Sequence, residues 1–187
     1  MTLVFLLEEP SARELLRPLL PKLIPSSVRT QFIVFEGKQD LERKLVRRIR
    51  GYLTPETHFV VVRDQDAGDC LEVKRRLVEL VTAAGRPDTL VRIACRELES
   101  WVLGDLFAVG EAYGVPKLAD LQQRRSYRDP DRIVRPVEEL KRHVRGYQKL
   151  DGARRVAPFL RPQHNTSRSF RAFCQGVRTL VDPADGE

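Results

Sequence analysis

Two acidic side chains directly follow the strongest strand pattern in the chain. Residues 59–62 (FVVV) are apolar and β-branched, which is typical of a buried strand, and Asp64 and Asp66 come just after them. Ala67-Gly68 favours a turn there, which would let both carboxylates converge on one cation. Carboxylate oxygens suit Mg²⁺ or Mn²⁺ better than zinc. The alternative is a solvated turn without a metal, in which Asp69 caps the following helix.

Other predicted strands also end in acids. The first, residues 3–7, ends at Glu8-Glu9, and the second, residues 32–35, ends at Glu36. Functional groups in an open parallel sheet gather at the carboxyl ends of the strands. We therefore expect these acids on the same rim as Asp64, where a divalent cation would relieve their mutual repulsion.

A fourth predicted strand, residues 90–94, leads into Glu97-Leu98-Glu99-Ser100-Trp101. Glu97 is a further candidate for the acidic rim. If a helix has begun by Glu99, Glu97 and Trp101 share one of its faces and Glu99 points elsewhere. Glu99 is then a candidate ligand of a second metal or a support for the first ligands, although acids also simply favour the first turn of a helix. Trp101, the single Trp, is predicted to be a packing anchor rather than a base-stacking platform.

Strands and helices alternate through the first 113 residues. Amphipathic helices are expected at about 11–20, 40–49, 71–84 and 97–113. This order predicts a doubly wound α/β fold with a mainly parallel, four-stranded sheet covered on both faces. From residue 116 onward, Pro and Arg punctuate short helical stretches and no strand pattern occurs. We predict an α/β core at 1–115 and a basic helical subdomain at 116–187 packed on it.

The positive charge of the chain is unevenly distributed. The 187 residues carry a formal net charge of +7, and 26 of the 33 basic residues are Arg. Residues 1–115 hold 17 Lys+Arg and 17 Asp+Glu, whereas residues 116–187 hold 16 and 9. A basic face favours a polyanion partner, and the arginine fork suits phosphate. Codon usage could explain the arginine bias, but it does not explain the distribution.

The basic C-terminal part offers candidate nucleic-acid contacts. They are Lys149, Arg154, Arg155, Arg168 and Arg171. These side chains could follow a phosphate backbone, with Tyr127 or Tyr147 stacking on a base. Lys149 is the best candidate for a phosphate contact or a cation that stabilises the transition state. The alternative is a set of solvated helix faces.

Several classes of protein are disfavoured. The three cysteines are scattered without a CxxC pair and the three histidines stand alone, which argues against a disulfide scaffold, a zinc site or a cysteine nucleophile. No apolar run approaches the roughly 18–20 residues that cross a bilayer. The first residues do not read as a signal peptide. We expect a cytoplasmic protein without a membrane partner.

Five segments together carry a family resemblance. They are 5–11 (FLLEEPS), 62–70 (VRDQDAGDC), 95–101 (CRELESW), 147–154 (YQKLDGAR) and 165–170 (NTSRSF). The chain resembles the DUF4276 family, which is regarded as Toprim-like and so is similar to the Toprim domains of topoisomerases, primases and OLD-family nucleases. The resemblance implies a Mg²⁺-dependent fold that processes phosphodiesters, often encoded beside an ATPase in antiphage defence loci.

One position departs from the Toprim pattern. Toprim domains usually have Glu-Gly after the first strand, and here Glu9 follows Glu8. A literal Glu-Gly occurs instead at Glu36-Gly37, after the second strand. The order of the strands favours Glu8 as the Toprim glutamate, and the local sequence favours Glu36.

The sequence supports two functional hypotheses. The first is a Mg²⁺- or Mn²⁺-dependent nuclease with an ATPase partner, in which Glu8, Asp64, Asp66 and Lys149 are catalytic. Glu8, Asp64 and Asp66 would hold the metal, and Glu36, Asp69, Glu97 and Glu99 are further candidate ligands. The second hypothesis is a non-catalytic module that binds a metal or nucleotide and docks nucleic acid or a partner protein. The rim of acids favours the enzyme, because a site that only binds phosphate would not need negative charge.

Overall fold

The computed structural model describes residues 1–182 and contains one four-stranded, all-parallel sheet. The strands are β1 (Thr2–Leu7), β2 (Arg29–Val34), β3 (Thr57–Asp64) and β4 (Leu90–Ala94). Their order across the sheet is β2-β1-β3-β4, so β1 and β3 are central. Both central strands are almost wholly buried, as their continuous apolar sequences predict.

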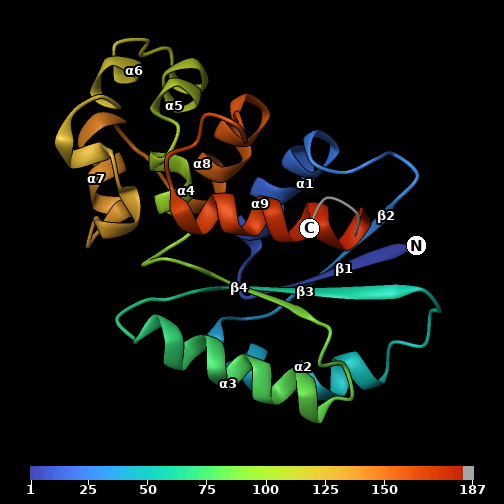
Figure 1. Cartoon of the computed structure of the whole chain (residues 1–187). Helices are drawn as coiled ribbons and strands as arrows, with labels where there is room; N and C mark the ends of the chain where they lie inside the picture. Colours follow the sequence, from blue (N-terminus) through green and yellow to red (C-terminus); the bar gives the residue numbers. More distant parts are fainter. Residues whose placement is uncertain (183–187) are drawn as a thin grey trace.

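Helices cover both faces of the sheet, which confirms the predicted doubly wound α/β fold (Figure 1). One face carries α2 (Lys38–Arg50) and α3 (Cys70–Ala83). Val4 and Leu6 of β1 point into this layer, where they join Leu45 and Leu77 in one buried cluster. The other face carries α1 (Pro10–Leu19) and α9 (Arg168–Val181).

The remaining helices follow β4 and lie above the same face as α1 and α9 (Figure 1). They are α4 (Glu99–Leu103), α5 (Leu106–Tyr113), α6 (Leu118–Leu121), α7 (Pro136–His143) and α8 (Lys149–Val156). Four short 3₁₀ turns complete the described part, namely η1 (Leu20–Lys22), η2 (Arg125–Tyr127), η3 (Pro130–Arg132) and η4 (Ala157–Phe159). Residues 95–182 contain no strand, and no helix within residues 1–182 has the length and apolar character needed to span a membrane.

The single helix expected at 97–113 is wrong, because two helices occupy this segment. α4 ends before Gly104, and α5 starts after Asp105, whose carboxylate caps it by accepting a hydrogen bond from the amide of Ala108 (3.3 Å). Gly104 has no room for a side chain, since an added Cβ would lie 2.0 Å from Oδ1 of Asn165. The break therefore follows from a tertiary contact with a segment about 60 residues away.

Trp101 is fully buried, which confirms its predicted packing role. Its ring lies 5.5 Å from Phe170 and 5.0 Å from Phe173 between ring centroids, and its Nε1 donates to Oγ of Ser169 (2.8 Å). The same buried cluster includes Phe5 of β1. Residues on both sides of position 115 thus share one core, and the division at 115/116 stays a prediction; residues 183–187 of the second part lie outside the described residues.

Candidate active site

Acidic residues from three strand ends meet at the carboxyl edge of the sheet. Glu8 and Glu9 follow β1, and Asp64 is the last residue of β3, paired in register with Ala94 of β4. Glu99 is the first residue of α4 and is only 1% exposed. Parallel pairing of β1, β3 and β4 brings these carboxylates to the same rim, as their positions after the strands predict.

The ammonium group of Lys149, the first residue of α8, lies among four of these carboxylates. Its Nζ is 3.4 Å from Glu99 and 3.7 Å from Asp64. It is also 3.8 Å from one oxygen each of Glu9 and Glu97. Lys149 is about one-third exposed. We call Glu9, Asp64, Glu97, Glu99 and Lys149 the lysine cluster.

The lysine cluster contains more negative charge than Lys149 balances. Burial raises the pKa of Glu99 from 4.5 to about 7, against the lowering effect of Lys149. Burial also raises the pKa of Asp64 well above its usual range, and the charge of Glu9 adds to this rise. Burial alone would lower the pKa of Lys149, but the surrounding carboxylates, first Glu99 and then Asp64, raise it above its ordinary value. The cluster therefore favours any added positive charge.

Glu8 and Asp66 lie beside the lysine cluster and have their own cations. Glu8 accepts a hydrogen bond from the amide of Asp64 (3.2 Å), and Nε of Arg63 lies 3.7 Å from its carboxylate. Asp66 pairs with Nζ of Lys38 at 2.9 Å. Burial is the main reason that the pKa of Glu8 is raised.

The backbone turns between Asp64 and Asp66, so that they face different cations. Asp66 has a left-handed φ of 57°, and its amide donates to the carbonyl oxygen of Arg96 (2.7 Å). The sequence predicted that the carboxylates of Asp64 and Asp66 converge on one cation. In the structure they do not, since Asp64 faces Lys149 and Asp66 faces Lys38. Within residues 1–182, no group of three or more Asp, Glu, His or Cys side chains is arranged to hold a metal ion.

Two of the further candidate ligands lie outside the lysine cluster. Asp69 is the N-cap of α3, where its Oδ1 accepts from the amides of Leu71 (2.9 Å) and Glu72 (3.0 Å), as the capping alternative predicts. The side chain of Glu36 is exposed, and none of its hydrogen bonds or ion pairs among the described residues reaches the lysine cluster. The other two further candidates, Glu97 and Glu99, both belong to the lysine cluster. Glu97 precedes α4, so it does not share a helix face with Trp101.

The predicted nucleic-acid contacts have different surroundings. Arg154 pairs with Glu14 (3.1 Å) and Arg155 with Asp151 (2.8 Å), whereas Arg168 and Arg171 are exposed without an ion pair among residues 1–182. The expectation that Tyr127 or Tyr147 stacks on a base is wrong, since they are 7% and 2% exposed.

Sequence reasoning assigned no role to Arg63 and Lys38. Arg63 is a charged residue at the end of an apolar strand and is 7% exposed, with Nη1 donating to Glu42 (2.6 Å). The available signal was an arginine at the end of an apolar strand, directly before Asp64. Lys38 had no comparable signal, because only the fold brings it to Asp66 from the first residue of α2, 28 residues earlier.

Comparisons with known proteins agree with this fold. The family described as "Domain of unknown function (DUF4276)" matches residues 7–178, and the chain belongs to that family. A search of the curated proteins found no match. The C-terminal region of the Burkholderia pseudomallei OLD protein is similar in structure, with a TM-score of 0.57 and 13% identity over 97% of each chain. The C-terminal region of the Xanthomonas campestris pv. campestris OLD protein has a TM-score of 0.52 and 15% identity, over 99% of this chain and 98% of that one. The fold is thus Toprim-like, of the type found in OLD C-terminal regions.

Proposed function

We propose that this DUF4276 chain is a nuclease that uses Mg²⁺ or Mn²⁺ to hydrolyse nucleic-acid phosphodiesters. One observation carries the proposal: six carboxylates gather at the rim of the sheet, and two of them, Asp64 and Glu99, are buried with raised pKa values. The mutual repulsion of these carboxylates destabilises the folded state, and Lys38, Arg63 and Lys149 balance only part of their charge. Hard divalent ions prefer carboxylate oxygens as ligands. The Toprim resemblance of the sequence implies the same Mg²⁺-dependent chemistry, and the fold agrees with that resemblance.

The oxygen donors of this set are of the type that a divalent ion prefers, and their side chains would rearrange around the ion when Lys149 moves aside. Asp64 and Glu99 would hold it together with Glu9 or Glu97, and Glu8 and Asp66 would hold a second ion or orient the ligands of the first. When bound, such an ion polarises the scissile phosphate and activates water for attack. In this proposal Asp64 keeps the metal-binding role expected from the sequence, Glu8 and Asp66 move from the first ion to a second ion or a supporting role, and Glu36 and Asp69 do not contribute.

Lys149 would supply the positive charge that the chain itself brings to the reaction. Its contacts with the four carboxylates are 3.4–3.8 Å long, which makes them ionic contacts rather than strong hydrogen bonds. No short hydrogen bond therefore fixes the direction of the Lys149 ammonium, and it could turn to a phosphate oxygen once a metal ion balances the carboxylates. There it would stabilise the negative charge that develops during hydrolysis.

A second candidate function is a binding module without catalysis. It is favoured by Lys149 itself, which already partly neutralises the lysine cluster without any metal. In this case the acids and Lys149 form a structural ion network, and the basic surface docks nucleic acid or a partner. In both cases we propose a cytoplasmic setting and an ATPase as partner, and for the nuclease a role in antiphage defence.

Thermal unfolding with and without Mg²⁺ or Mn²⁺ tests the metal site. The metal should raise the Tm of the parent, because a ligand that binds only the folded state stabilises it. Asp64→Asn and Glu99→Gln should be as stable as the parent in chelator, or more stable, and should gain less from the metal. Glu111→Gln is the matched control, since Glu111 is an exposed acid of α5. Equal metal responses in all four proteins would refute the ligand assignment.

Incubation with mixed DNA and RNA then separates the two candidate functions. The parent should cleave with Mg²⁺ or Mn²⁺ and not with chelator, and Asp64→Asn should lose several orders of magnitude in rate. Lys149→Met should bind the metal at least as well as the parent, since a competing cation is gone, but should cleave far more slowly. A metal response in the melt without any cleavage would support the binding module instead.

A further inference from the structure

A row of arginines without acidic partners leads from α6 to the acidic rim. Residues 124–145 hold eight Lys+Arg and four Asp+Glu. Three of the four acids are paired with near neighbours, namely Asp129 with Arg132, Glu138 with Lys141 and Glu139 with Arg142. The fourth, Asp131, accepts hydrogen bonds from the side chain of Ser167 (2.6 Å) and the amide of Ser169 (2.7 Å). The other arginines of this segment form no ion pair within residues 1–182.

Three surface hollows meet along this segment. The first, of about 740 Å³, is lined by Arg125, Arg128 and Ile133 among others. The second, of about 530 Å³, continues from Ile133 and Val134 to Arg135.

The third hollow, of about 270 Å³, connects Val134 to Asp66, Arg96 and Glu97 at the acidic rim. The first two hollows share Ile133 and the second and third share Val134, so the three lie in series; we call this series the path, and it ends at the candidate active site. The side chain of Val134 is 69% exposed.

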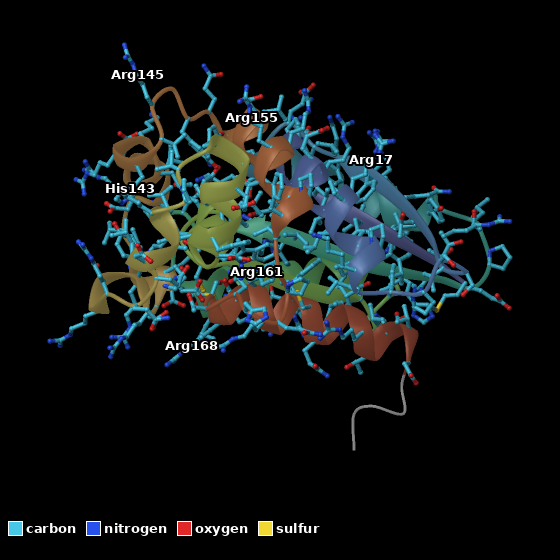
Figure 2. The ribbon with its side chains drawn as sticks, turned by 90° about the horizontal axis from the view of Figure 1, so that it is seen from above. Arg17, His143, Arg145, Arg155, Arg161 and Arg168 are labelled. Carbon is cyan, nitrogen blue, oxygen red and sulfur yellow. The ribbon has the colours of Figure 1, made fainter. Side chains whose placement is uncertain are left out.

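Four arginines that line this path have no ion pair among the described residues. We call them the arginine strip: Arg96, Arg125, Arg128 and Arg135. Arg125, Arg128 and Arg135 are exposed, and Arg96 is half-buried. Arg145 and Arg168 project from the surface at the same end of the molecule as His143 of α7 (Figure 2). The path thus presents unpaired guanidinium groups along its length, among acids that are already paired with near neighbours, and carboxylates at its end.

We infer that the arginine strip holds the phosphate backbone of a nucleic acid and directs it to the acidic rim. This inference rests on the proposed nuclease function and adds the surface that presents the substrate. Successive guanidinium groups match a polymer with one negative charge per repeat, and Arg forms bidentate contacts with phosphate. An acidic protein would also meet the arginines, but only a phosphodiester is a substrate for the metal-binding rim proposed above, where the path ends. The exposed Val134 offers an apolar contact to a sugar or base.

Binding in chelator tests the strip without requiring cleavage. The probes are labelled single-stranded and duplex DNA and RNA, measured by fluorescence anisotropy at several salt concentrations. R125Q/R135Q should bind about 10-fold or more weakly at low salt, and its log Kd should depend on log salt with a slope smaller by about 2, because two phosphate contacts are lost. Comparing the Kd values of the single-stranded and duplex DNA and RNA probes identifies the nucleic acid that the surface binds most tightly.

R47Q/R48Q is the matched control. Arg47 and Arg48 lie on α2, under the opposite face of the sheet, and are exposed without an ion pair within residues 1–182. This control removes the same charge and should bind as the parent does. Equal weakening by both double variants, or no weakening by R125Q/R135Q, would overturn the inference.

Two further outcomes separate this inference from the proposed function. Polyglutamate that competes as well as nucleic acid would also overturn the inference, since it would favour an acidic protein partner. Strip-dependent binding without cleavage under any metal would uphold the inference while the proposed nuclease function fails. If R125Q/R135Q cleaved at the parent rate with subsaturating substrate, the inference about the arginine strip would fail and the proposed nuclease function would stand.

Discussion

Glu99 shows how burial turns a carboxyl group into a source of pH dependence. Its pKa is raised from 4.5 to about 7 by burial. Between these values the folded state binds more protons than the unfolded state, so the free energy of unfolding falls as pH rises. This contribution of Glu99 is fully present below about pH 4.5 and lost above about pH 7, and the shift corresponds to about 3 kcal/mol. Asp64, with its raised pKa, acts in the same direction.

We therefore predict that Glu99→Gln flattens the pH profile of stability. In chelator, the parent should lose stability between about pH 4.5 and about pH 7, and the variant should lose less, because Gln carries no charge to bury. Denaturant unfolding across this range measures the difference. Glu111→Gln, at an exposed site, should retain the parent profile. A Glu99→Gln profile that is as steep as that of the parent would contradict the assignment of the slope to Glu99.

Some of these residues could be predicted from sequence and others could not. The acids after β1 and β3 could be placed, because strand ends are visible as boundaries of apolar runs. The different directions of Asp64 and Asp66 could not, since they depend on one left-handed residue that is Asp rather than Gly. The position of Lys149 among the acids depends on how α8 packs, which a local pattern does not contain.

At the scale of the helix, α8 is held in place by the ring of Tyr147. A Cβ added at Gly152 would lie 2.2 Å from this ring, so only glycine fits against it. Tyr147 is 2% exposed, and α8 begins at Lys149. The same helix thus positions the central cation of the acidic rim and requires a glycine within its first turns.

Gly152→Ala should therefore destabilise the fold and disturb the lysine cluster. Alanine favours a helix by about 1 kcal/mol over glycine, so a net loss of about 1–3 kcal/mol would report the clash with Tyr147. Denaturant unfolding measures the loss, and the metal response of the melt should change with it. Asp151→Ala, at the half-exposed neighbouring position, should lose less than about 1 kcal/mol. Unchanged or increased stability of Gly152→Ala would show that α8 can shift freely.

The elements themselves were predicted well where their periodicity was long. All four strands, and the helices α1, α2 and α3, lie within a few residues of their expected positions. The helix expected at 97–113 is less accurate, because the contact of Gly104 with Asn165 divides it into α4 and α5. Tertiary packing there overrides weak local preferences.

For the whole molecule, the shared core has consequences for the predicted boundary at residue 115. Trp101 and Phe5 lie in the same buried cluster as Phe170 and Phe173 of α9. A fragment of residues 1–115 would expose one face of the sheet, including these apolar side chains. We predict that it does not fold alone, as judged by near-UV circular dichroism and amide exchange, whereas the full chain unfolds in one transition. A folded fragment would support two independent domains.

The place of Lys149 also sets the conditions under which an ion can enter the acidic rim. Because the lysine is tethered to α8, it competes with incoming cations at a constant effective concentration that dilution cannot lower. A divalent ion can displace the ammonium because it carries twice the charge and coordinates several carboxylate oxygens. A monovalent ion brings no more charge than the ammonium that it replaces. Occupancy would then still rise hyperbolically with the free divalent-ion concentration, but with an apparent Kd that the competition from Lys149 raises.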